Sequence, residues 1–561
     1  MPYKRLLSTI TIVVLFFSSS VFSQEAVLTL VPATSDTSTY INWQIIADTT
    51  ATNGLLPNRV YELQRDQYYA MNRTFTVLTG ETIRLRAEEG SGAKPIVYLI
   101  DSNIPPNPTR PPGNMFVLNG AHLVMKNICV AGFYEPIPDE VNGVQGGLIN
   151  TTAVGSSIIL DGVIFSNING QHVRTGENST KVEIRNSIFA NMGALETSNL
   201  GAGKGIDLRQ SSCDSLIIVN NTFVNYQDRP IRHYFIGNPD STGLINYGLI
   251  DHNTFINGMG FHGLFSLGSV GDEIHITNNL FIDAFALGED STDGTRTSEW
   301  ANTGEIYSNG NNRIMWIFST PNTTTNWMIS NNYYSVSDEG QAWLDDNHFG
   351  FGPFGRASQL SWHINSRLGA DSVNAFMNED NLALGNIPNL MTNMMTWYEN
   401  PAGGNRTKNT PAGGTFNWLT DDYDRRVIEY YRDTLDATYP TTAAAYTGST
   451  TGEPVGDLNW FPQFLSVEQL DNVPSNFELL QNYPNPFNPN TTIKFKLEEN
   501  GFVTLSVYNV LGQKVQTLVS EELTFGTHQV DFDASALSSG VYFYKLESGK
   551  QTSVKKMMLL K

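Results

Sequence analysis

Basic side chains occupy matching positions in three short apolar segments of the chain, at residues 171–174, 205–209 and 230–234. Arginine binds a carboxylate through two parallel hydrogen bonds. Histidine, lysine or tyrosine can remove a proton when the surroundings lower the pKa of the side chain. Neutralising a carboxylate and removing the proton beside it are the requirements for β-elimination from a uronate sugar. These segments therefore form a candidate site for an acidic glycan.

The period-two alternation of a β-strand assigns a direction to each of these side chains. When one apolar residue of each segment is aligned as inward, Arg174, Asp207 and Arg232 fall in one outward column. The aligned inward residues are Val173, Ile206, Ile231 and, in a fourth segment, Gly263. The neighbouring outward positions hold Arg209, Tyr234, His172 and His262. A shift of one residue would invert all of these directions.

This alignment assigns candidate roles to the polar side chains. The candidates for carboxylate neutralisation and proton transfer are Arg232, Lys204, His233 and Tyr234. The candidates for substrate contact are Arg174, Arg209, Arg229, His172 and His262. Asp207 is the candidate metal ligand. An alternative needs no substrate, because Asp207 could neutralise Arg174 and Arg232 in a purely structural surface ladder.

The elements that position these segments are indicated by a repeat between about residues 120 and 335. An Asn follows alternating apolar residues, and a Phe comes three positions later. Clear copies are Val182–Phe189, Ile218–Phe223 and Ile274–Phe281, and weaker copies end at Val130, Phe165, Phe255 and Tyr334. From Phe165 to Tyr334 the steps are 24, 34, 32, 26 and 53 residues, and the last step suits two coils. The repeat predicts a solenoid of stacked parallel strands.

Within one copy, Val182, Ile184 and Asn186 share a face, so the pattern predicts that all three point into the solenoid. Copies that lie one strand spacing apart, about 4.8 Å, would stack these side chains in columns. A buried Asn column is stable when each amide bonds its neighbours. Two earlier segments, 82–86 and 96–99, alternate in the same way and predict additional coils.

The repeat resembles that of the right-handed parallel β-helix proteins of the pectate-lyase-like superfamily, over roughly residues 40–340. Ile231-Arg232-His233 is similar to the Leu-Arg-His segment of the chondroitinase B and alginate lyase family, which implies a catalytic Arg232. That family also implies a lysine base and calcium-binding glutamates on the preceding coil, where this chain has Asp207 and Arg209, with Lys204 earlier. The base and the need for calcium therefore stay open.

A second resemblance concerns Gly260–Ser269, which is similar to the Gly-His-Gly segment of the polygalacturonases. Inverting hydrolysis needs two carboxyl groups, and the aspartates of that family have no counterpart on the matching coils. The sequence therefore favours a polysaccharide lyase over a glycoside hydrolase. It leaves open a non-catalytic glycan-binding or adhesin-like protein, in which the charged ladder is structural.

Residues 340–463 lose the repeat and predict an irregular, partly helical cover over the last coil and one flank of the solenoid. Short helices are predicted after Pro388 and around Tyr423–Leu435. The alternative for this region is a lid along a binding groove. Gly456–Phe461 resembles the closing strand of secreted β-helix proteins, which predicts a domain over 24–463.

After a linker at 464–475, residues 476–561 predict a compact all-β module with alternating strands. The motifs Asn482–Asn488, Tyr508–Gly512 and Ser539–Tyr542 resemble the C-terminal sorting domain of the type IX secretion system. The resemblance implies an immunoglobulin-like sandwich that the secretion machinery recognises for export across an outer membrane. A carbohydrate-binding sandwich is the alternative.

The N-terminus predicts a secretory signal peptide over residues 1–23, because Lys4 and Arg5 precede an apolar run and small residues follow it. No later segment predicts a membrane span. The two cysteines, Cys129 and Cys213, exclude a disulfide scaffold and a zinc module built from cysteines.

The net charge of the 561-residue chain is −21, and it is unevenly distributed. The signal carries two positive charges and the C-terminal module is neutral, so residues 24–475 carry a net charge of −23. This acidity argues against nucleic-acid binding and against docking on anionic membranes. A polysaccharide partner that is itself acidic would therefore need a local basic patch, and the candidate site is such a patch.

Overall fold

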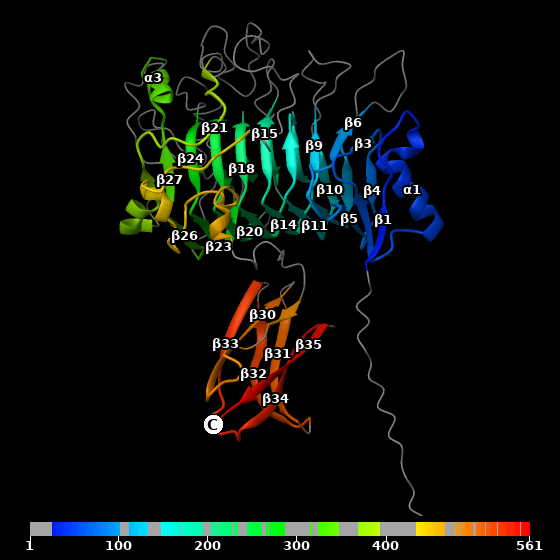
Figure 1. Cartoon of the computed structure of the whole chain (residues 1–561), viewed down its shortest axis with the longest axis vertical. Coiled ribbons are helices and arrows are strands. Elements are labelled where there is room, and N and C mark those ends of the chain that lie inside the picture. Colours follow the sequence, from blue (N-terminus) through cyan, green and yellow to red (C-terminus); the bar gives the residue numbers. More distant parts are fainter. Residues whose placement is uncertain are drawn as a thin grey trace, which may run out of the picture. The chain divides into compact units, whose positions relative to one another are not determined.

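The fold is seen in a computed structural model of the chain (Figure 1). The chain divides into two compact units, Met1–Phe464 and Leu465–Lys561. The structure describes residues 25–100, 112–132, 147–168, 170–193, 203–209, 211–226, 229–233, 244–260, 265–267, 269–286, 315–316, 324–346, 368–392, 434–465, 477–480, 482, 484–497, 501–510, 512–523, 526–549 and 551–560. The predicted signal at 1–23 lies outside this range, as does most of the predicted linker.

The first unit is a parallel β-helix, as the repeat predicts, because its strands pass in turn through three parallel sheets. Sheet 1 consists of β1 (Ala26–Thr29), β2 (Arg59–Leu63), β5 (Thr82–Ala87), β8 (His122–Lys126), β11 (Ser156–Asp161), β14 (Ser179–Arg185), β17 (Cys213–Val219), β20 (Leu244–Asp251), β23 (Ser269–Thr277) and β26 (Asn326–Ser330). Sheet 2 consists of β3 (Tyr68–Met71), β6 (Ile96–Leu99), β9 (Cys129–Ala131), β12 (Ile164–Ser166), β15 (Ile188–Met192), β18 (Thr222–Tyr226), β21 (Thr254–Gly260), β24 (Leu280–Ala286), β27 (Asn332–Ser335) and β28 (Phe376–Asn378). Sheet 3 consists of β4 (Phe75–Val77), β7 (Phe116–Asn119), β10 (Ile149–Ala153), β13 (Gln171–Thr175), β16 (Lys204–Asp207), β19 (Ile231–His233), β22 (Phe265–Leu267) and β25 (Met315–Trp316).

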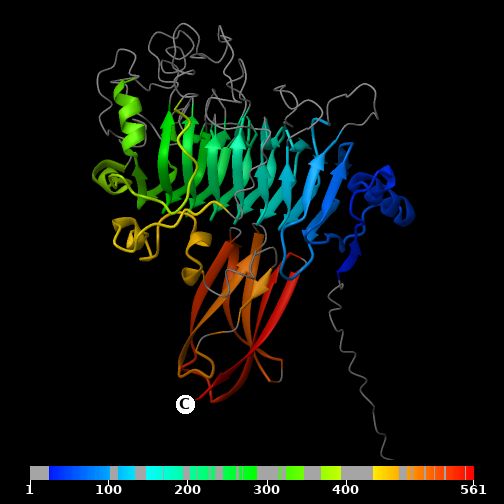
Figure 2. The same ribbon diagram turned by 45° about the horizontal axis from the view of Figure 1, so that its top comes forward.

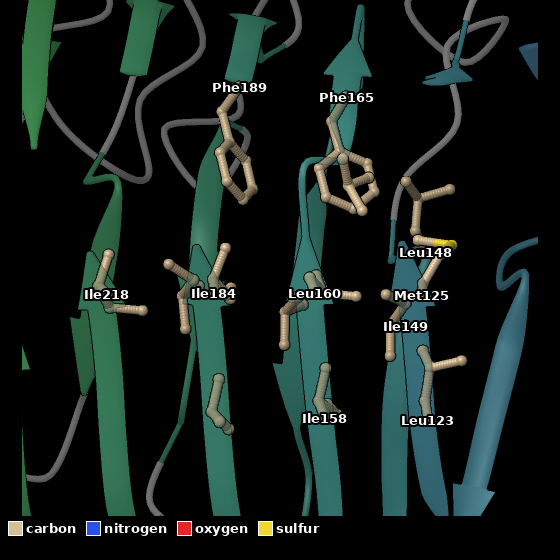
Figure 3. Packing of buried hydrophobic residues seen from close by; sticks show 14 of the residues in the cluster. Leu123, Met125, Leu148, Ile149, Ile158, Leu160, Phe165, Ile184, Phe189 and Ile218 are labelled. Carbon is tan, nitrogen blue, oxygen red and sulfur yellow. The ribbon is translucent and has the colours of Figure 1, made fainter. Parts of the chain in front are cut away.

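Stacked apolar columns fill the interior of the helix. The rings of Phe189, Phe223, Phe255 and Phe281 lie 4.7 to 4.9 Å apart between neighbours, one strand spacing per coil. Figure 3 shows Phe165 and Phe189 beside each other above the row of Leu160, Ile184 and Ile218. The predicted two coils between Phe281 and Tyr334 are wrong, because these two residues pair directly. The interval of 53 residues is therefore a single coil with a long connection.

The buried Asn column exists, but it lies one residue later than the motif predicts. Asn186, Asn220 and Asn278 have φ angles between 53° and 58°, in the left-handed region that Asn tolerates at turns. The turn between sheets 1 and 2 ends the strand alternation at these residues. The next position points inward, and there the amide of Asn221 donates to Asn253 at 2.9 Å and Asn253 to Asn279 at 2.9 Å.

Short helices lie at both ends of the stack. At one end, Ile41 and Ile45 of α1 (Ile41–Thr52) complete the core, after the 3-10 turn η1 (Thr37–Thr39). At the other end lies α3 (Asp338–Asp346), followed by η3 (Gly369–Asn374). Both ends can be followed in Figure 2. The sequence did not indicate the N-terminal cap.

Residues 434–464, here named the strap, cover the outer face of sheet 2. Apolar side chains of the strap, among them Tyr439 and Phe461, pack on Ala190, Val224 and Ile256 of β15, β18 and β21. The strap contains three short 3-10 helices, η4 (Ala444–Thr447), η5 (Leu458–Trp460) and η6 (Pro462–Phe464). The predicted closing strand at Gly456–Phe461 is therefore wrong, because these residues form η5 and its flanks.

The helix predicted after Pro388 does not begin there, since Pro388–Met391 are not helical, whereas Thr392 is. The amide of Asn257 donates to the carbonyls of Pro388 and Asn389, which holds this segment against the β-helix. The remainder of this helix lies outside the described residues, as does nearly all of the one predicted at Tyr423–Leu435.

The second unit has two antiparallel sheets that share one core. One sheet consists of β29 (Glu478–Leu479), β30 (Asn490–Leu497) and β33 (Gly526–Asp533). The other consists of β32 (Lys514–Leu523), β31 (Gly501–Asn509), β34 (Gly540–Ser548) and β35 (Gln551–Leu559). Phe495 of the first sheet and Leu505 and Tyr544 of the second are buried in this core. In the part of the chain that the structure describes, no helix has the length and apolarity to cross a membrane.

Candidate functional site

The outward column on sheet 3 is confirmed for its three charged members. Val173 pairs with Ile206 and Ile206 with Ile231, and all three are buried in the core. Arg174 therefore lies beside Asp207 on the outer face, and Asp207 lies beside Arg232. The alignment of Gly263 is wrong, because Ile231 pairs with Phe265. Gly263 and His262 lie outside the described residues.

Asp207 forms a buried ion pair with Arg232. Nη1 of Arg232 lies 3.2 and 3.3 Å from the two carboxylate oxygens of Asp207. Asp207 is 0% exposed and Arg232 is 8% exposed. The same carboxylate accepts the backbone N–H of Arg209 at 3.3 Å. The carboxylate of Asp207 thus binds both the guanidinium group of Arg232 and the backbone of the turn at Arg209.

Arg174 and Arg209 differ from Arg232 in having no acidic partner. Among the described residues, neither guanidinium group makes a hydrogen bond or an ion pair. Arg174 is half-buried on β13 and Arg209 is exposed just after β16. Partial burial lowers the pKa of Arg174, and the positive charge of Arg209 lowers it further, opposed by Asp207. The charge of Arg209 therefore acts on Arg174 from the same face of the sheet.

Two histidines do not reach this face. His172, expected to point outward, is buried with its ring edge-on against Phe165 and Phe189 in the core. His233 pairs with the core residue Leu267, and its Nε2 lies 3.1 Å from the carbonyl of Ser211. Burial lowers the pKa of each imidazole to about 4, so both rings are neutral near pH 7. The outward direction assigned to His172 is wrong, because His172 and the next residue, Val173, both pack in the core.

The remaining candidates are buried or lie outside the described residues. Lys204 opens β16 and is 2% exposed, and its carbonyl accepts a hydrogen bond from Nδ1 of His172 at 3.0 Å. Arg229 precedes β19 and is also 2% exposed. Tyr234 lies outside the described residues. Within the described chain, the cations of this site that solvent reaches most easily are therefore Arg174 and Arg209.

Asp207 does not fit the role of a calcium ligand. Calcium takes six to eight oxygen ligands, including several carboxylates. The described residues contain no group of three or more acidic, histidine or cysteine side chains that could hold a metal ion. Apart from Asp207, the charges that act on Arg174 are those of two further arginines, Arg209 and Arg232. This positive environment repels a divalent cation.

Two features of the site were not predicted. Asn150 of β10 extends the column by one coil, because it pairs with Arg174 of β13. Arg209 has a φ angle of 54°, in the left-handed region. The backbone N–H of Arg209 donates to the carboxylate of Asp207, two residues earlier. An Asp at this spacing is a sequence signal for such a turn.

The second unit matches a known protein family. The model of the secretion system C-terminal sorting domain matches residues 481–560. No curated protein matches the chain. The match agrees with the resemblance seen in the sequence and with the two antiparallel sheets of the second unit. The protein therefore carries a type IX sorting domain, interacts with the type IX secretion machinery and is exported to the cell surface or the surrounding medium.

Proposed function

We propose that the β-helix binds an acidic polysaccharide outside the cell, on the outer face of sheet 3. The observation that carries this proposal is the pair of guanidinium groups of Arg174 and Arg209, which share one face without an acidic partner among the described residues. Two cations held together in this way repel each other, and an anionic ligand between them removes that repulsion.

The charge distribution supports the same conclusion. Residues 24–475 carry a net charge of −23, so the molecule as a whole repels polyanions. A polyanion can then bind only where the local field is positive. On sheet 3, three guanidinium groups stand near one carboxylate, and that carboxylate is already paired with Arg232.

Cleavage of the bound chain by β-elimination is a second candidate function. Elimination requires that the uronate carboxylate be neutralised before the neighbouring proton is removed, and the two unpaired arginines supply that neutralisation. Lys204 is the candidate base that shares β16 with Asp207, while His233 faces the core. Lys204 is 2% exposed, so it must become accessible when the ligand binds.

Binding is tested with polygalacturonate, hyaluronan and neutral dextran immobilised on a sensor surface. We expect the protein to be retained by at least one uronate polymer and not by dextran, with affinity that falls as salt increases. Arg174→Ala should weaken binding by about tenfold, the loss of one charge-assisted hydrogen bond. Arg84→Ala is the matched control, because Arg84 is a half-buried arginine on sheet 1. Equal retention of the wild type and Arg174→Ala would show that Arg174 is not part of the binding site.

Elimination is tested separately, by the ultraviolet absorbance of unsaturated uronate ends after incubation with the same polymers and with alginate and chondroitin. Absorbance that grows with time, and that Lys204→Ala abolishes while binding is kept, would establish a lyase. Binding without any new absorbance would leave a non-catalytic glycan-binding protein.

A further inference from the structure

The backbone at Arg209 is unusual among the left-handed turns of this molecule. Fifteen described residues other than glycine have a positive φ angle, and fourteen of them are Asn, Asp or His. Arg209, with φ of 54°, is the exception. Asn and Asp tolerate this conformation because their short side chains bond the local backbone, whereas arginine gains nothing comparable and is strained there.

This strain lies beside the two unpaired guanidinium groups. Strained residues persist where the surrounding structure enforces them, and they gather at functional sites. The enforcing contact is present here, since the carboxylate of Asp207 accepts the N–H of Arg209. The same carboxylate holds Arg232, and it is completely buried. Asp207 therefore fixes both the direction of Arg209 and the position of Arg232.

We propose that Arg174 and Arg209 form a clamp that binds one uronate carboxylate between two guanidinium groups, with Asp207 as the positioning residue that builds it. This inference rests on the proposed function and deepens it. A planar carboxylate has two oxygens, so it can accept hydrogen bonds from two guanidinium forks at once. Asn or Gly at position 209 would relieve the backbone strain but would remove one half of the clamp.

The two uncompensated charges are consistent with this assignment. Burial lowers the pKa of Arg174 most, and the charge of Arg209 lowers it further, while Asp207 opposes both effects. A carboxylate in the clamp would offset the repulsion between the two cations. The ion pair of Asp207 and Arg232 beside the clamp is neutral, so it does not attract a second anion to the same place.

The test compares the full chain with Arg209→Gly, using polygalacturonate and hyaluronan as probes. The clamp predicts that Arg209→Gly loses about tenfold or more in affinity for whichever probe the wild type retains. It also predicts that the same variant unfolds at a higher temperature, by about 1 °C, because the strain is relieved. A structural arginine would show the opposite, a lower unfolding temperature with unchanged binding, and that result would overturn the clamp.

Asp207→Asn provides an independent test of the positioning role. If the outer face were only a field of charges, removing a negative charge would tighten binding of a polyanion. The clamp predicts weaker binding, because Arg232 and the turn at Arg209 lose their anchor. Tighter binding by Asp207→Asn would contradict the positioning role. If dextran sulfate retained the wild-type protein as well as the uronate probes do, the choice of a carboxylate as the bound group would be contradicted. If the wild type retains neither uronate probe, the proposed function itself fails.

Discussion

Two outer faces of the same β-helix use their polar groups differently. On sheet 2 and its turn with sheet 1, the strap bonds the turn residues: the amide of Asn459 donates to the carbonyl of Asn220, and the N–H of Thr450 to Asn278. On sheet 3, Arg174 and Arg209 have no such partners in the described chain. The first face is completed by the chain itself, whereas the second keeps two guanidinium groups without a partner among the described residues.

The left-handed turns show the same contrast. Asn occupies the turn between sheets 1 and 2 in most coils, where it adopts a positive φ angle at little cost. The turn after β16 places arginine in that conformation. The turns between sheets 1 and 2 thus use a residue that suits the backbone, whereas the turn after β16 keeps one that does not, as the proposed binding role would require. Substitutions on the two faces should therefore have effects of different size and sign.

The largest effect is expected at Arg232. Arg232→Ala leaves the buried carboxylate of Asp207 without its cation, which should lower the free energy of unfolding by about 3–5 kcal/mol. Urea unfolding measures this loss. The double variant Asp207→Asn with Arg232→Met removes both charges and should recover most of the stability. A loss below about 1 kcal/mol for Arg232→Ala would show that water reaches Asp207.

The Asn ladder should be the next most sensitive element. Asn253→Ala removes the acceptor of the Asn221 amide and the donor to the carbonyl of Ile218. Leaving such groups buried and unbonded should lower the free energy of unfolding by about 2–4 kcal/mol. Asn326→Ala, at an exposed strand position on sheet 1, is the control and should change stability by less than about 0.5 kcal/mol. Equal losses in the two variants would disprove the importance of the ladder.

The strap should depend on pH through Asp457. This carboxyl is buried, and burial raises its pKa to about 6 although Thr222 and Asn459 donate to it. A raised pKa means that the folded state binds the proton more tightly than the unfolded state. Stability should therefore increase as pH falls, by about 1 kcal/mol between pH 7 and pH 5.

Asp457→Asn keeps the side chain neutral at all pH values, so its stability should vary less over this range than that of the wild type. Thermal unfolding at pH 5 and pH 7 measures the difference between the two proteins. Identical pH dependence in both would mean that Asp457 ionises freely in the folded strap.

The smallest effect on stability is expected at Arg174, although the proposed function predicts that Arg174→Ala weakens binding by about tenfold. Arg174 is half-buried and carries no ion pair in the described chain, so Arg174→Ala should change the free energy of unfolding by less than about 0.5 kcal/mol. Urea unfolding alongside Arg232→Ala gives the direct comparison. A loss as large as that of Arg232→Ala would show that Arg174 is a structural residue like its neighbour.

Much of the fold could be predicted because the interior of a β-helix is periodic. The Phe residues recur once per coil, and each apolar alternation marks a strand of sheet 1 or sheet 2. The register of β13, β16 and β19 followed from Val173, Ile206 and Ile231 for the same reason. The prediction failed where the period is interrupted: at the turn that moves the Asn column by one residue, at Gly263 and in the interval before Tyr334.

The candidate site could be predicted only in part. Alternation on a strand determines which side of the sheet a residue occupies, and this was enough to place Arg174, Asp207 and Arg232 together. It does not determine how deep a side chain lies or which partner it chooses. The burial of Lys204, the inward direction of His172 and the pairing of Asp207 with Arg232 depend on neighbours from other coils.

By itself the sequence determined the β-helix, the sorting domain at its C-terminus and the three charges that share one face, because these depend on local period and motif. Only the tertiary structure decided which of those charges are satisfied. Which cation pairs with a buried carboxylate depends on the distance between the two side chains and on their burial, and a sequence pattern gives neither. Asp207 pairs with Arg232, and Arg174 and Arg209 are the two guanidinium groups of this face that have no acidic partner within hydrogen-bond distance among the described residues.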